Sequence, residues 1–262
     1  MPSRRTKPAR SSGNSGGYWI AALVVVAGVV AYGAYYLFNV SKSHETDSAT
    51  GCLTGKRPPK AAMFLIDTTD RLSPENARYV IETIKREEAD LPRFSRVILV
   101  PFGDDTATPL SPIFNKCLPG RAEEAGIDEN ARFLRAAAEE FDRSLEALQE
   151  KLQGIESSRT SPITEQVVRA ASSPVLDWQG DARRLVLISD GLESSIYWSR
   201  DLQLADPKPG MLAGVEAEYV ELGNAKGARL QTDEMRERWK SWFAKAGATV
   251  RMTAPGYVAT SD

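Results

Sequence analysis

Two short acidic segments follow apolar runs that are typical of buried strands. The first is DTTDR, residues 67–71, and the second is SDGLES, residues 189–194. Between them, RTSPITE, residues 159–165, adds hydroxyl groups where a helix is expected to begin. Carboxylate and hydroxyl oxygens suit Mg²⁺, which takes few carboxylates and keeps several waters. We therefore expect a site of oxygen donors made of Asp67, Thr69, Ser161 and Asp190, with an open position for an acidic group of a partner.

The elements that must position these side chains alternate along the chain. Strands are expected at residues 62–67, 96–102, 183–189, 215–222 and 248–253, with a weaker, proline-containing strand at 107–114. Helices are expected after Ser73, over a long apolar stripe capped by Asp128 (Leu134, Ala137, Phe141, Leu145, Leu148, Leu152), over residues 162–171, and from Thr232 to Gly247. This alternation predicts a doubly wound α/β fold, with helices on both faces of a mainly parallel sheet. Ligands bind such sheets at the carboxyl ends of the strands.

With these motifs, the chain resembles a von Willebrand factor A (VWA) domain over about residues 60–255. Asp67 matches the aspartate of that family's D-x-S-x-S motif and Thr69 its first hydroxyl. Ser161 stands at the threonine of the second loop, and Asp190 with Gly191 matches the third motif. The resemblance implies a Rossmann-like sheet, a metal-ion-dependent adhesion site and a role in protein binding rather than catalysis.

One position departs from the family pattern. Arg71 stands where the family has a second serine, and a guanidinium cannot ligate a cation. Two alternatives therefore stay open: a degenerate site that still binds Mg²⁺, and a metal-free site in which Arg71 pairs with Asp67 or Asp190. Tyr197 and Trp198 directly follow the third loop. Together with Arg71 they are candidate binding residues, because aromatic and arginine side chains often anchor interfaces; a buried short helix would explain the two aromatics equally well.

Two other functional classes compete with partner binding. A Mg²⁺-dependent phosphatase of the haloacid-dehalogenase type would use Asp67 as nucleophile, but that family needs D-x-D and residue 69 is threonine. A structural membrane anchor without an active ligand site is the other alternative. We assign no catalytic residue, and the single histidine, His44, excludes sites that need two imidazoles.

Charge and hydropathy divide the chain into an N-terminal segment and a body. Residues 1–17 hold four bases and no acid, which leaves 29 of the 33 bases against 35 acids in the rest. Such a body disfavours nucleic-acid binding, which needs a dense basic surface. Residues 18–40 carry no charge and are long enough to cross a bilayer, with aromatic residues near both ends. We expect a signal-anchor, with a cleaved signal peptide as the rival interpretation.

These features predict a membrane protein with four segments. They are a cytoplasmic basic tail (1–17), a transmembrane helix (18–40), a polar stalk (41–60) and a VWA-like domain (61–258). The positive-inside rule places the domain in the periplasm or exterior, with a bacterial inner membrane as the expected location and a protein of unknown identity as partner. On that oxidising side we expect a disulfide between Cys52 and Cys117, with two free buried thiols as the alternative.

Overall fold

The computed structural model describes residues 15–43, 45–125, 129–194, 204–224 and 227–253. The chain divides into two units, Met1–Glu45 and Thr46–Asp262, which are described separately. The first contains helix α1, Ser15–Ser43. Its described side chains are apolar and exposed, for example Trp19 at 73%. Within the described residues, no helix reaches the length and hydropathy that a membrane crossing requires. Membrane anchoring therefore stays a prediction from the sequence.

The second unit is built on a six-stranded sheet in the order β3-β2-β1-β4-β5-β6. The strands are β1 Lys60–Asp67, β2 Arg96–Phe102, β3 Phe114–Cys117, β4 Ala182–Ser189, β5 Val215–Glu221 and β6 Thr249–Thr253. All neighbouring pairs are parallel except β2 with β3. The central strands are continuous apolar runs because both of their faces are covered. The predicted mainly parallel α/β sheet is thus confirmed.

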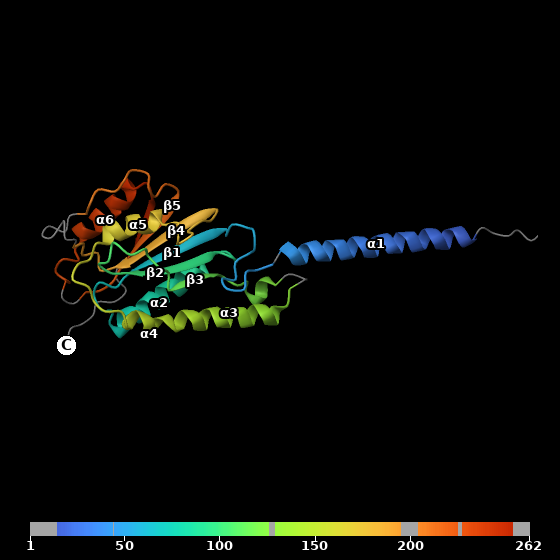
Figure 1. The fold of residues 1–262 in the computed structure, drawn as a ribbon, viewed down its shortest axis with the longest axis horizontal. Helices are drawn as coiled ribbons and strands as arrows, with labels where there is room; N and C mark the ends of the chain where they lie inside the picture. Colours follow the sequence, from blue (N-terminus) through green and yellow to red (C-terminus); the bar gives the residue numbers. More distant parts are fainter. Residues whose placement is uncertain (1–14, 44, 126–128, 195–203, 225–226, 254–262) are drawn as a thin grey trace, which may run out of the picture. The chain divides into compact units, whose positions relative to one another are not determined.

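Helices cover both faces of the sheet (Figure 1). On one face lie α2 Pro74–Ala89, α3 Ala131–Glu146 and α4 Leu148–Gln153, and on the other lie α5 Ile163–Ser172 and α6 Asp233–Lys245. A short 3₁₀ turn, η1, spans Ala122–Glu124. As predicted, Ser73 caps α2, because its hydroxyl accepts the backbone N–H of Asn76 at 3.1 Å. Each face therefore has its own apolar core.

Two predicted elements differ from the structure. The third strand is antiparallel and begins only at Phe114, because Pro109 and Pro112 cannot donate to a strand ladder. The long helix is broken at Ala147 into α3 and α4, and Asn130 caps α3 by accepting the N–H of Arg132 at 2.9 Å. The expected cap, Asp128, lies outside the described residues.

Part of the segment expected to be a stalk, residues 41–60, is folded onto the domain. Thr46 and Leu53 form an isolated bridge, and the N–H of Cys117 donates to the carbonyl of Thr50 at 2.7 Å. A disulfide joins Cys52 to Cys117, as predicted. Because Cys117 pairs with Arg96 at the start of β2, these contacts lie at the edge where the parallel strands begin. We call this edge the base, and the opposite edge the crater edge.

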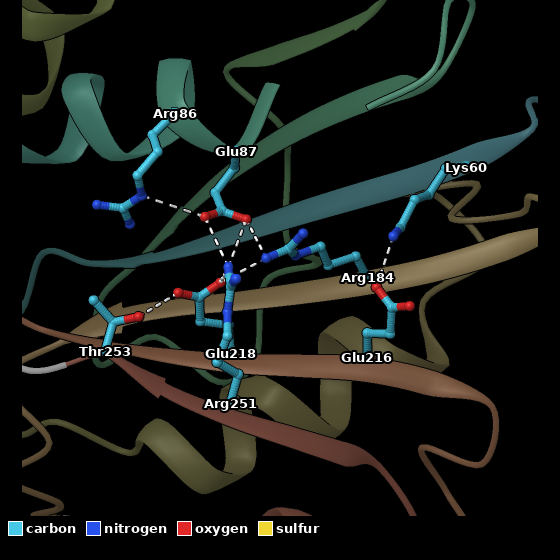
Figure 2. Close-up of polar contacts among 8 residues, drawn as sticks. All are labelled: Lys60, Arg86, Glu87, Arg184, Glu216, Glu218, Arg251 and Thr253. Atoms are coloured by element: carbon cyan, nitrogen blue, oxygen red, sulfur yellow. Dashed lines mark hydrogen bonds and ion pairs between the residues drawn. The ribbon is translucent and has the colours of Figure 1, made fainter. Parts of the chain in front are cut away.

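A buried group of charges crosses the sheet on the α2 face (Figure 2). Arg184 of β4 lies between Glu87 of α2 and Glu218 of β5, and it contacts Glu218 at 2.8 Å. Arg251 of β6 donates to Glu87 at 3.0 Å and also to Glu218. Both glutamates are almost completely buried, whereas the Arg251 side chain is 55% exposed. Charge pairing therefore helps to hold the outermost strand, β6, against β5 and α2. Apolar packing contributes little there, because few side chains of β6 are buried.

Removing one partner of this group should destabilise the domain. We expect Glu87→Ala to lower the free energy of unfolding by about 2–4 kcal/mol, because Arg184 loses a buried partner while solvent still reaches Arg251. Urea denaturation of the full chain in mild detergent, followed by tryptophan fluorescence, measures this. Glu216→Ala is the control: Glu216 pairs with Lys60 at an exposed position and should cost less than about 1 kcal/mol. Equal losses in the two variants would contradict the assignment.

Candidate functional site

The carboxylate of Asp67 is the point at which the ends of β1 and β4 meet the loop between α4 and α5. Asp67 ends β1, and its side chain is buried. Its Oδ1 accepts the backbone N–H of Thr69 at 3.0 Å and the Thr69 hydroxyl at 2.6 Å. Its Oδ2 accepts the hydroxyls of Ser189 at 2.6 Å and Ser161 at 3.3 Å. The predicted residues Asp67, Thr69 and Ser161 are thus in direct contact.

Further hydrogen bonds hold the three loops in register. Thr68 donates its N–H and its hydroxyl to the carbonyl of Phe102, at 3.0 and 2.9 Å, which fixes the first loop to the end of β2. Ser161 and Ser194 exchange backbone hydrogen bonds at 2.6 and 2.9 Å, which fastens the second loop to the third. The crater edge is therefore a connected rim.

The third loop depends on a glycine and on aromatic packing. Gly191 has φ +75°, and a Cβ there would lie 2.3 Å from the hydroxyl oxygen of Tyr219. The indole N–H of Trp239 donates to the carbonyl of Gly191 at 3.0 Å. Only glycine fits this close approach. The tight turn at Gly191 follows Asp190 directly and fixes its backbone beside the pocket described below.

Asp190 lies beside Asp67 at a half-buried position. Its Oδ1 accepts the N–H of Leu192 at 2.9 Å, and its Oδ2 accepts the side-chain amide of Asn224 at 2.6 Å. The same amide donates to Asp70 at 2.9 Å. Burial, with the nearby charge of Asp67, raises the pKa of Asp190 to about 7, and burial also raises the pKa of Asp67. The carboxyl pair is thus costly to ionise fully.

A pocket of about 290 Å³ opens beside the two carboxylates. It is lined by side chains of the first loop, the start of α2, Ser157, Asp190 and the loop after β5 (Asp67, Thr69, Asp70, Arg71, Leu72, Ser73, Asn76, Ser157, Asp190, Leu222, Gly223, Asn224). We call this pocket with its rim the crater. Carboxylate, hydroxyl and amide groups are among its lining groups, so it can receive a small charged or hydrogen-bonding group of a ligand.

Arg71 lies on the rim of the crater. Its Nε donates to the carbonyl of Gln153 at 3.4 Å. In the described part of the chain it forms no ion pair with Asp67 or Asp190, so the pairing that one of the two alternatives requires is not found there. The charge of Asp67 is met by hydroxyl and amide donors. The other two candidate binding residues, Tyr197 and Trp198, lie outside the described residues.

The crater fits a metal ion in donor type but holds few acids. Among the described residues, no group of three or more His, Cys, Asp or Glu side chains is arranged to hold a metal. The hydroxyls of Thr69 and Ser161 donate to Asp67 and keep lone pairs for a cation. These hydroxyls with Asp190 would hold Mg²⁺, which would neutralise the carboxyl pair and polarise a bound acidic group.

Sequence reasoning missed three residues of the site. Ser189 and Asn224 bind the two carboxylates directly, and Glu193 accepts the N–H of Thr164 at 2.8 Å, which ties the third loop to the first turn of α5. Burial raises the pKa of Glu193 to about 7. Two features of the sequence could have indicated these residues. Ser189 directly precedes Asp190, and a polar loop follows β5, a strand that ends at the crater edge.

Comparisons with known proteins give only distant similarities. No family model and no curated protein sequence matches the chain. Among solved structures, it is similar to the human COPII-coat protein Sec24c, with 14% identity, a TM-score of 0.38, and coverage of 79% of this chain and 31% of that one. It is also similar to the D319A mutant of the PilB minor pilin from Streptococcus sanguinis, with 8% identity, a TM-score of 0.38, and coverage of 76% of this chain and 57% of that one. A third similar structure holds three N-terminal domains of the type V pili tip protein Mfa5 from Porphyromonas gingivalis. The identity is 10%, the TM-score is 0.29, and the match covers 58% of this chain and 25% of that one.

The chain thus spans less than two thirds of each of these structures. Membership of the VWA family remains a prediction from the sequence motifs.

The raised pKa of Asp190 predicts a pH-dependent stability. The folded-state pKa of about 7 exceeds the unfolded value, so the cost of ionisation is full above pH 7 and falls as the pH is lowered from 7 toward about 4. We expect the wild type to gain stability between pH 8 and pH 5, with at most about 3 kcal/mol from Asp190. Asp190→Asn should lose that part of the gain in urea denaturation. Glu193 and Glu88 also have pKa values raised to about 7, and they contribute equally to the pH dependence of both proteins. If the wild type and Asp190→Asn show the same change of unfolding free energy with pH, the pH dependence does not come from Asp190.

Proposed function

We propose that this chain is a membrane-anchored, VWA-like protein-binding or assembly-scaffold domain whose crater receives a polar group of a partner. The observation that carries the proposal is the convergence of three loops on Asp67. The hydrogen bonds connect the rim around the half-buried carboxylate of Asp190, beside an open pocket. Rigid loops at the carboxyl ends of a parallel sheet are the usual place for ligand recognition. An acidic group of the partner would enter with Mg²⁺, in line with the VWA resemblance.

The same geometry disfavours the phosphatase alternative. A nucleophilic Asp67 would need a free oxygen directed at a phosphorus atom. Both of its oxygens instead accept hydrogen bonds, and the side chain is buried. A structural anchor without a ligand site remains the second candidate, because the hydrogen bonds of Asp67 would also serve a purely structural role.

Three features support membrane anchoring with the domain outside the cytoplasm. Residues 18–40 are uncharged, and the described side chains of α1 expose apolar surface. Four bases precede them, which favours a cytoplasmic N-terminus. The disulfide between Cys52 and Cys117 suits an oxidising compartment such as the periplasm. Because the chain enters the domain at the base, the crater is at the edge remote from the tether.

Changes in the crater should remove the partner without unfolding the domain. We expect Asp190→Asn to abolish co-purification of the partner from detergent-solubilised membranes, because it removes charge but keeps a side chain of similar shape. Asp206→Asn is the matched control, since Asp206 is exposed and pairs with Lys245 on the surface. Quantitative mass spectrometry of the captured proteins provides the readout. An unchanged set of captured proteins for Asp190→Asn would favour the structural anchor.

Protease treatment tests the proposed orientation. Protease added to intact spheroplasts should digest the domain, residues 46–262, and leave a protected N-terminal fragment of the size of residues 1–40. Digestion only after the membrane is breached would reverse the orientation. A mature protein that starts after residue 40 would instead show cleavage of a signal peptide.

A further inference from the structure

The first half of α3 is an exposed helical segment at the base of the domain. Phe141 packs on Phe114 with ring centroids 5.1 Å apart, and from there the helix continues backward toward its start at Ala131. Ten residues of α-helix correspond to about 15 Å. The beginning of the helix is held near the base, because Glu129 accepts a hydrogen bond from Arg93 at 2.7 Å. Figure 1 shows α3 reaching past β3 at that end of the sheet.

The composition of this segment differs from that of an ordinary solvated helix. Residues 131–138 read ARFLRAAA, with two bases and no acid. Phe133 is 76% exposed, the largest exposed fraction among the large apolar residues recorded for this unit. In the described part of the chain, neither Arg132 nor Arg135 is in an ion pair. An exposed aromatic ring on the same helical turns as two arginines without an ion pair among the described residues is a composition found in segments that lie at a lipid–water interface.

Only a short segment joins the uncharged stretch to the domain. Five residues, 41–45, lie between Val40, the end of the uncharged stretch, and Thr46, where the domain begins. Even fully extended, the six Cα–Cα steps from Val40 to Thr46 span about 20 Å. Where residues 18–40 cross a bilayer, as proposed above, this length limits the distance of Thr46 from its surface. A helix that extends about 15 Å from its buried anchor at Phe141 covers a comparable distance.

We propose that residues 131–138 of α3 dock on the anionic headgroup surface of the membrane that α1 spans. This inference rests on the proposed membrane anchoring. Phe133 enters the interfacial layer, and Arg132 and Arg135 bind lipid phosphates. Docking fixes the base against the bilayer and presents the crater toward the periplasm, so the helix acts as a second, non-covalent support for the domain.

Single cysteine labels test the proposal in the full chain, since both native cysteines are in the disulfide. A nitroxide is attached at Ala136→Cys, at Val26→Cys in α1 or at Leu230→Cys, an exposed position near the start of α6. Each chain is placed in nanodiscs of phosphatidylcholine and phosphatidylglycerol, one chain per disc. Collision with oxygen and with a water-soluble nickel chelate reports lipid and water contact. We expect lipid contact at 26, severalfold lower nickel collision at 136 than at 230, and free nickel access at 230.

A second substitution shows whether Phe133 carries the contact. In the chain labelled at 136, Phe133→Ser should restore nickel access, whereas Phe133→Trp should keep the label protected. Discs of phosphatidylcholine alone should protect the label less, because the arginines lose the anionic surface.

The remaining outcomes overturn the inference. Lipid contact at 26 with equal nickel access at 136 and 230 refutes the docking and leaves the anchoring intact. Water contact at 26 refutes the anchoring and the docking together. Protection at 136 only when two chains share a disc would identify a second copy as the occupant. Protection only in native membranes would identify a protein partner.

Discussion

The crater depends on one buried carboxylate. Asp67 accepts hydrogen bonds from Thr69 in the loop after β1, from Ser161 in the loop before α5 and from Ser189 at the end of β4. Burying a carboxylate is costly unless its oxygens are satisfied, so the three hydroxyls must stay in place while the side chain is buried. The requirement links segments 94 and 122 residues from Asp67 in the sequence, and it sets the position of Asp190 next to them.

Neutral donors, and not Arg71, meet the charge of the crater among the described residues. Hydroxyls satisfy Asp67, and a shared amide from Asn224 bridges Asp190 and Asp70. Neutral donors lower the cost of the carboxylates only in part, which is why the pKa of Asp190 stays high. The unmet part of that cost is what a ligand cation, or a metal with an acidic ligand, could recover on binding.

Most of the strands and the caps at Ser73 and Thr232 could be predicted from the sequence because local patterns determine them. The apolar run before Asp67 predicted β1, which begins two residues earlier than expected, and Ser73–Pro74 predicted the start of α2. The partner of Arg71 could not be predicted, since a long side chain on a rim can reach several acceptors and only the packed structure selects Gln153. Asn224 was missed because its loop carries no motif. The loop reaches Asp190 because it follows β5, and β5 pairs with β4, the strand that ends just before Asp190.

A double-mutant cycle between Asp67→Ala and Ser189→Ala tests the central claim most directly, with Asp67→Ala and Ser95→Ala as the control pair. Ser95 is buried at the base, remote from Asp67. Urea denaturation of the single and double variants gives the coupling free energy. The account predicts about 1 kcal/mol or more for Asp67 with Ser189, and additive effects for Asp67 with Ser95. Additivity in both cycles would contradict the role of Asp67 in joining the loops.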